Sequence, residues 1–189
     1  QTVQIDTKTT RGREISHRVL PLKIYVSTQT GRRYVLGWYF KARRIVFYRL
    51  DNIRTITEPE ELSDYEAYIT KGELMERNLW GVSLGARDFN NVKNLDHVEL
   101  VLRVDKEEGY VVKCLEREKR CGHVEKIAEN RYRLVADVHV SGEMLPWLRT
   151  FMGRIESFTS SNKNVEQRFW SDINTLAAMY GVGEEKTDE

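Results

Sequence analysis

The side chains best suited to binding chemistry gather in one basic, aromatic-rich run, residues 21–53. Its cations, with the one that follows it, are Lys23, Arg32, Arg33, Lys41, Arg43, Arg44, Arg49 and Arg54, against a single acid, Asp51. An arginine fork binds phosphate oxygens in a bidentate manner, and a tyrosine ring stacks on nucleic-acid bases. The run therefore predicts a surface for anions that carry flat rings, and nucleotides combine both features.

Five short antiparallel strands are predicted to position these side chains. Apolar and β-branched residues indicate strands over 2–7, 14–27, 32–41, 45–50 and 55–57. Pro21 lies inside the second strand and removes one ladder hydrogen bond, so we expect a bend or an edge position there. A sheet of this size buries its apolar face by curling on itself. The prediction is a small SH3-like or Sm-like β barrel over residues 1–58.

A helical connector and a loop, residues 59–96, are expected to separate this barrel from a second domain. In the second domain, the pattern of apolar residues predicts strands over 98–104, 122–127, 131–140 and 154–158, and helices over 107–119 and 141–151. The order β-α-β-β-α-β predicts a ferredoxin-like domain over residues 97–183, completed by a C-terminal helix that Gly181 ends. The fold class is therefore α+β. Residues 184–189 form an acidic tail that we expect to be disordered.

Composition limits the class of protein. The 189 residues carry a net charge of +1, but the first 54 residues are basic and residues 58–76 are acid-rich, which matters more for binding a polyanion. Cys114 and Cys121 are interpreted as reduced thiols, although they could pair. We find no membrane span and no signal-peptide pattern, and predict a cytoplasmic protein. Because the chain starts at Gln1 directly in a strand-like pattern, we interpret it as a fragment.

Catalytic and metal-binding patterns are not found. His97, His123 and His139 do not make metal-ligand spacing with either cysteine. Asp105 and Glu107 suit the start of a helix better than an acid–base pair. The sequence has no glycine-rich phosphate loop and no nucleophile elbow. It therefore predicts a binding protein without metal or cofactor rather than an enzyme.

Several short stretches, in order, resemble the WYL-domain transcriptional regulators of bacteria, without their usual N-terminal winged-helix DNA-binding domain. These stretches are residues 17–21, 30–34, 48–53, 80–81 and 143–151. The resemblance implies that the barrel is a WYL domain and the second half its WCX extension. It further implies an effector-sensing and dimerisation region that binds single-stranded DNA, RNA or a nucleotide. DNA would be bound through an N-terminal domain absent from this chain.

The same resemblance selects Tyr34 and Arg49 as the main ligand-binding residues. Arg33-Tyr34-Val35 follows the turn at Gly31 and fits the name-giving tripeptide better than Trp38-Tyr39-Phe40 does, although Arg33 stands where the family has Trp. Tyr34 and Tyr39 are an odd number of residues apart, so they face opposite sides of a regular strand. Only one of them can line the pocket, and we select Tyr34.

Four further residues are weaker candidates for the same pocket. Arg33 and Arg44 add phosphate contacts, or else are solvated surface arginines. His17 lines the pocket or holds a backbone carbonyl, and Ser27 donates a hydroxyl to the ligand or simply ends its strand. The alternative function is a protein–protein docking module with no small effector, because small barrels serve that role too.

Overall fold

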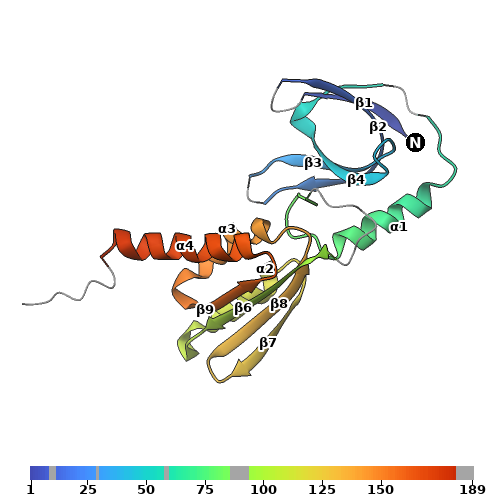
Figure 1. Ribbon diagram of the computed structural model, residues 1–189. Helices are drawn as coiled ribbons and strands as arrows, with labels where there is room; N and C mark the ends of the chain where they lie inside the picture. Colours follow the sequence, from blue (N-terminus) through green and yellow to red (C-terminus); the bar gives the residue numbers. More distant parts are fainter. Residues whose placement is uncertain (9–11, 29, 58–59, 86–93, 182–189) are drawn as a thin grey trace, which may run out of the picture. The chain divides into compact units, whose positions relative to one another are not determined.

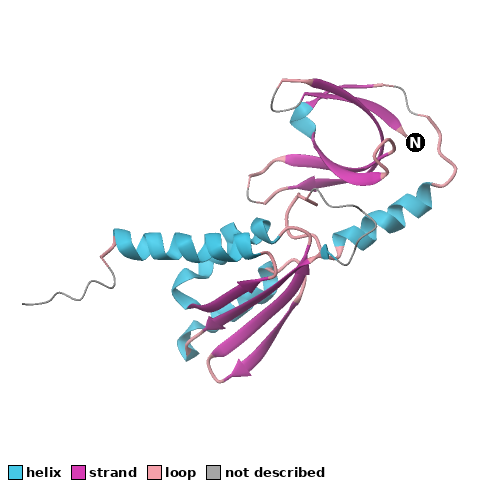
Figure 2. Cartoon of the chain, in the orientation of Figure 1, coloured by secondary structure: helices cyan, strands magenta, loops and turns pink. Residues whose placement is uncertain are grey.

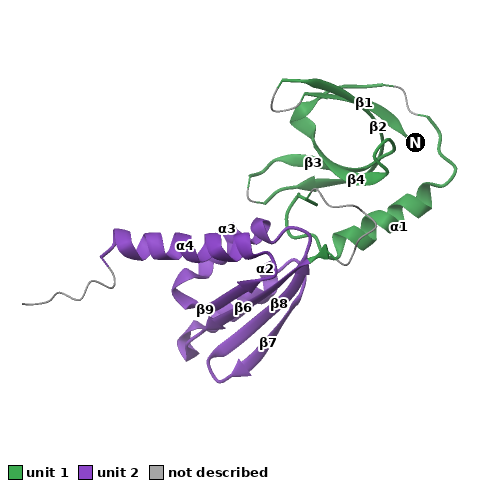
Figure 3. Ribbon diagram, viewed as in Figure 1, with its two compact units in different colours: residues 1–95 green, residues 96–189 purple. Residues whose placement is uncertain are grey.

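The chain is described by a computed structural model over residues 1–8, 12–28, 30–57, 60–85 and 94–181. It divides into two compact units, Gln1–Leu95 and Asp96–Glu189 (Figure 3). Each unit contains one antiparallel sheet together with helices, so the fold class is α+β (Figure 2). The predicted acidic tail, residues 184–189, and most of the predicted loop before Asp96 lie outside the described residues.

The first unit is built on a five-stranded sheet with the strand order β4-β3-β2-β1-β5. The strands are β1 (Val3–Lys8), β2 (Glu14–Val26), β3 (Arg33–Tyr39), β4 (Arg44–Arg49) and β5 (Ile53–Ile56). Pro21 does produce a bend, because the register of β2 against β3 shifts between Pro21 and Lys23. The strand nevertheless lies inside the sheet, between β1 and β3, and not at its edge.

The sheet curls (Figure 1), but it is not the closed barrel that the sequence predicted. β4 and β5 are its two edges, joined through the 3-10 turn Leu50–Asn52, and no pairing between them is found in the described part of the chain. β5 has only four residues, and its register against β1 shifts at Asp6/Thr7. A short edge strand beside a bulge offers few backbone groups in line for closure.

The two faces of this sheet bury different cores. One face, here called the helix face, carries Leu20, Leu36, Trp38 and Ile45 and is covered by α1 (Tyr65–Glu76), whose Tyr68 ring lies 5.3 Å from that of Trp38. The opposite face buries a smaller cluster of Ile5, Val19 and Tyr48. Every ligand candidate on β2, β3 and β4 therefore belongs to one of these two environments.

The second unit is a four-stranded antiparallel sheet with the order β7-β8-β6-β9. Its elements are β6 (Asp96–Arg103), α2 (Gly109–Glu118), β7 (His123–Ala128), β8 (Arg131–Val138), α3 (Leu145–Leu148), β9 (Ile155–Ser160) and α4 (Lys163–Met179). The helix predicted over 141–151 is mostly 3-10, with α3 as one α-helical turn that has Pro146 at its start. Proline there suits a first turn but not a helix interior.

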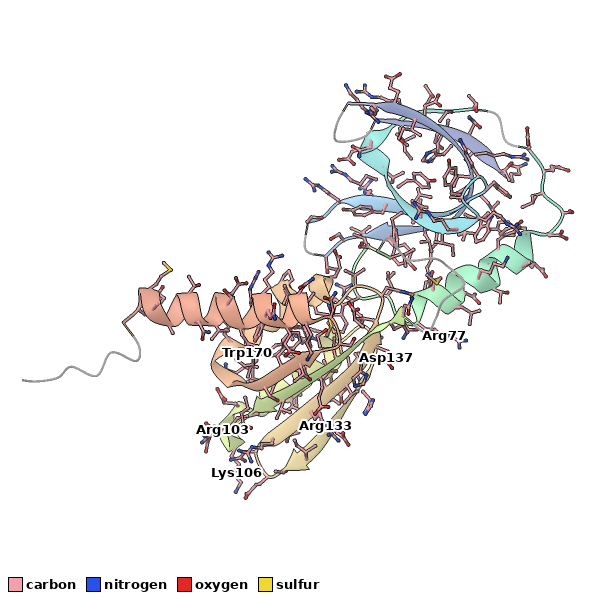
Figure 4. All side chains as sticks on the ribbon, in the orientation of Figure 1. Arg77, Arg103, Lys106, Arg133, Asp137 and Trp170 are labelled. Atoms are coloured by element: carbon pink, nitrogen blue, oxygen red, sulfur yellow. The ribbon has the colours of Figure 1, made fainter. Side chains whose placement is uncertain are left out.

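The sheet of the second unit is apolar on one face and charged on the other. Val98, Leu100 and Leu102 are fully buried on the face that the helices cover. On the other face Arg133 bonds Glu125 at 2.7 Å and lies 3.6 Å from Glu99, and His97 lies 2.8 Å from Asp137; Arg133 and Asp137 are labelled in Figure 4. Arginine and histidine side chains on this face are therefore paired with carboxylates of neighbouring strands.

A buried carboxylate ties β6 to the start of α4. Asp96 is 3% exposed and accepts hydrogen bonds from the Ser141 amide at 3.0 Å, the Ser141 hydroxyl at 2.8 Å and the Asn162 side-chain amide at 3.3 Å. Ser141, the first residue of the helix predicted over 141–151, therefore donates its hydroxyl to Asp96.

Asp96→Asn is expected to lower the free energy of unfolding of the second unit by about 2 kcal/mol, because all three donors meet one oxygen of Asp96 and a neutral amide oxygen accepts more weakly than a carboxylate oxygen. Chemical denaturation followed at amide resonances of β6 measures this loss. The matched control is Asp137→Asn, an exposed aspartate on β8, for which a change below about 0.5 kcal/mol is expected. Equal losses at both positions would contradict the assigned role of Asp96.

Candidate anion-binding site

Tyr34 and Arg49, the pair favoured by the sequence, are direct cross-strand partners on β3 and β4. They lie on the helix face, since Tyr34 shares the parity of Leu36 and Trp38 in an unbroken register. The Tyr34 ring meets that of Phe47 edge-on, with centroids 6.3 Å apart. The structure therefore brings these two residues together as expected.

The guanidinium of Arg49 is already engaged. Its Nε donates to Asp51 Oδ1 at 3.0 Å and a terminal nitrogen bonds Oδ2, so the fork is filled by a carboxylate. This contact lowers the pKa of Asp51 and raises that of Arg49. A phosphate at this position would have to displace Asp51, which makes the pair a poor anion site as it stands.

A second group of ring side chains gathers on the opposite face. The His17 ring stacks on that of Tyr39, with centroids 4.2 Å apart and planes at 26°. His17 Nδ1 lies 3.1 Å from the Tyr48 hydroxyl, and the two rings meet edge-on at 5.6 Å. Tyr48 is buried, while His17 and Tyr39 remain half-buried, so a ligand can reach the stacked pair.

Two cations border this group. Arg44 is the cross-strand partner of Tyr39, and Lys41 lies in the turn between β3 and β4. Both are exposed, and both act on the pKa of His17. Neither has an ion-pair partner in the part of the chain that the structure describes. We call His17, Tyr39, Lys41, Arg44 and Tyr48 the aromatic–cation cluster.

The electrostatics of the cluster favour an added anion. Burial lowers the pKa of His17 below its ordinary value of 6.5, and the charges of Lys41 and Arg44 lower it further. Burial, followed by Tyr39, raises the pKa of the Tyr48 phenol. His17 is therefore neutral at pH 7, and the only full charges are the two cations. An anion beside them is attracted and would also make protonation of His17 easier.

His17 makes the stability of the first unit depend on pH. Between the lowered folded pKa and 6.5, unfolded His17 binds more protons than folded His17, so stability rises with pH across this window and is fully present above 6.5. Urea denaturation of the whole chain at about pH 5 and about pH 7.5, followed at first-unit amides, is expected to show weaker folding at the lower pH. His17→Gln should flatten this dependence, whereas His97→Gln in the second unit should leave it unchanged. An undiminished dependence in His17→Gln would assign it to another group.

The remaining two candidates, Ser27 and Arg33, lie at the turn between β2 and β3. Arg33 is paired with Val26 and is exposed, and it shares the strand face of Tyr39 at the far end of β3. Ser27 organises the turn between β2 and β3: its carbonyl accepts from Gly31 N at 2.8 Å and its amide donates to the Arg32 carbonyl at 2.8 Å. Ser27 therefore follows the last residue of β2 and holds the turn through its backbone.

No family model and no curated protein matches this sequence. Among solved structures it is similar to a CRISPR Cas-related protein at 10% identity, with a TM-score of 0.56 over 97% of this chain and 48% of that one. It is also similar to proteasome accessory factor B/C of Arthrobacter aurescens at 11% identity, with a TM-score of 0.38 over 95% of this chain and 25% of that one. The first likeness concerns the fold alone. The chain spans about half the length of the first structure and a quarter of the second.

Sequence reasoning missed Tyr39, Tyr48 and Lys41. It placed Tyr39 on the other side from Tyr34, which is where it lies, but then chose between them before the register of β3 and β4 was known. Had that register been available, pairing of Tyr39 with Arg44 would have placed Tyr39 on the face of Tyr48. Within the described ranges, no group of three or more His, Cys, Asp or Glu side chains is placed to hold a metal, and no helix is long and apolar enough to cross a membrane.

Proposed function

We propose that the first unit is a ligand-sensing module that binds an anionic, ring-bearing ligand at the aromatic–cation cluster. Single-stranded DNA, RNA or a nucleotide has this chemistry. The observation that carries the proposal is the half-buried His17–Tyr39 stack beside Lys41 and Arg44, two cations with no carboxylate partner among the described residues. Aromatic faces stack on bases and cations hold phosphates, so the cluster supplies both halves of nucleotide recognition.

The wider proposal is that this chain is the effector-sensing and dimerisation region of a cytoplasmic, non-enzymatic transcriptional regulator of the WYL type. The motifs quoted above support it. The curled five-stranded sheet supports an SH3-like or Sm-like relationship, and the antiparallel order β7-β8-β6-β9 supports a ferredoxin-like second unit. The second unit would pair subunits, and an N-terminal domain outside this chain would contact DNA. A ligand switches such a regulator only by binding two arrangements with unequal affinity.

Fluorescence anisotropy with a short labelled single-stranded oligonucleotide tests the site. Tyr39→Ala is expected to weaken binding by about tenfold, because one aromatic–base stack is worth about 1–3 kcal/mol. The matched control is Tyr34→Ala, on the same strand but the other face, for which no change is expected. If Tyr34→Ala lost oligonucleotide binding and Tyr39→Ala kept it, the site would lie on the helix face. If both variants kept oligonucleotide binding, the proposal would be wrong.

A further inference from the structure

A cleft beside β4 takes no part in the proposed binding of the anionic ligand. A cleft of about 190 Å³ is bounded by Arg44, Ile45, Val46 and Phe47 on β4, by Met75 on α1, and by residues 82–85. Successive side chains of a strand point to opposite faces. A cleft bounded by four consecutive strand residues must therefore run along the edge of the strand and not across one face.

Among the described residues, nothing pairs with that edge. β4 is the terminal strand of its sheet and pairs with β3 from Arg44 to Arg49 in an unbroken register. No described residue pairs with its other side. Proline residues and β-bulges commonly protect an edge strand from pairing. β4 contains no proline, and its pairing with β3 shows no bulge. Its outward N–H and C=O groups are therefore in line to accept one more strand.

The side chains around the cleft indicate which kind of added strand would bind there. Phe47, Met75, Val82 and Leu84 supply an apolar wall, and none of the described residues that bound the cleft is acidic. Arg44 stands at one end, next to the exposed Arg43 and Lys41 of the turn. Arg43 itself is held at a φ of 50°, a conformation that non-glycine residues adopt at a cost and that fixes the direction of the turn. The charge suits an acidic partner and the wall suits one apolar side chain.

We propose that the edge of β4 binds an extended acidic peptide segment of a partner protein by adding it as a sixth strand to the sheet. The backbone of the segment pairs with β4, an apolar side chain enters the wall formed by Phe47, Met75 and Leu84, and acidic side chains meet Arg44 and the turn. A nucleic acid fits this edge less well, because it has no alternating amide groups to continue the ladder. The peptide cleft is distinct from the stacked rings of the aromatic–cation cluster, although Arg44 borders both.

Amide NMR of the whole isotope-labelled chain tests this edge directly. The probe is a short synthetic peptide in which glutamate alternates with valine around a central leucine. We expect shifts confined to residues 41–49, Met75 and residues 82–85 that saturate at or below about 1 mM peptide. Methylating alternate backbone nitrogens on one edge of the peptide should abolish the shifts, and methylating those on the other edge should not, because only one edge of an added strand pairs with β4.

Two variants separate the cleft from the ligand site. Ser83→Glu places a like charge beside the acidic peptide and should weaken its binding about tenfold, whereas Ser83→Lys should not weaken it. Tyr39→Ala should leave peptide binding intact. The proposal is overturned by an absence of shifts at about 1 mM peptide, by equal effects of the two methylation patterns, or by an oligonucleotide that shifts the same cleft residues and is lost in Ser83→Glu.

Discussion

Reversing both cations of the aromatic–cation cluster, in Lys41→Glu with Arg44→Glu, is expected to weaken binding of a short single-stranded oligonucleotide by about a hundredfold at low salt. The two side chains are the full charges next to the His17–Tyr39 stack, and their reversal replaces attraction of phosphate by repulsion. Each phosphate contact that is lost should also lower the slope of log affinity against log salt by roughly one. Anisotropy titrations over a series of salt concentrations measure both quantities.

A change in net charge alone must be excluded. Arg103→Glu with Lys106→Glu makes the same change in net charge on the second unit, where both residues are exposed (Figure 4). This control is expected to alter affinity by less than about threefold. A further comparison is Arg49→Gln, which removes the guanidinium paired with Asp51 at the end of β4 and should have little effect on binding. An equal loss in the second-unit control would show that the attraction is not local to the cluster.

Gly122→Ala is expected to lower the free energy of unfolding of the second unit by about 3 kcal/mol. Gly122 precedes β7 with a φ of 83°, which disfavours any side chain. A Cβ there would lie 2.3 Å from the Val135 carbonyl oxygen and 2.7 Å from the Ala136 Cβ. Because the nearest atom belongs to the backbone of β8, relief requires displacement of the β7–β8 pair. Urea denaturation followed at amides of β8 measures the loss.

Gly109→Ala is the matched control for this substitution. Gly109 is the first residue of α2, has a helical φ of −52°, and has open space where a Cβ would stand. Alanine there should be neutral or stabilise by about 0.5 kcal/mol, through the lower entropy of the unfolded chain. If Gly122→Ala cost no more than Gly109→Ala, the close approach of the Gly122 turn to β8 would not be a constraint of the folded unit.

Local pattern was a good guide to the elements. Alternation of apolar residues predicted each of the nine strands of the described ranges to within a few residues, because burying one face of a strand requires apolar side chains at every second position. The apolar pattern was a poorer guide to a short segment whose backbone is also affected by a proline and by a side-chain hydrogen bond. The predicted helix over 141–151 became mostly 3-10, since Pro146 and the donation from Ser141 to Asp96 both act on its start.

The candidate site shows where sequence reasoning stopped. His17 and Arg44 were predicted to line the same pocket as Tyr34 and Arg49, but the structure places them with Tyr39 on the opposite face of the sheet. Tyr34 and Arg49 were correctly expected to be neighbours, but Asp51, two residues further along, occupies the guanidinium. An ion pair across a 3-10 turn depends on side-chain geometry that no spacing rule specifies.

The amino-acid sequence by itself determined which residues alternate, where the strands turn, and that Tyr34 and Tyr39 face opposite ways, because each of these properties is set within a few residues along one strand. Only the tertiary structure decided that Tyr39 meets His17 and Arg44, that α1 covers the face of Tyr34, and that β4 is a terminal strand of its sheet. These outcomes depend on register and pairing between segments far apart in the chain. Register is chosen by the sum of many contacts across the sheet and not by any one of the segments.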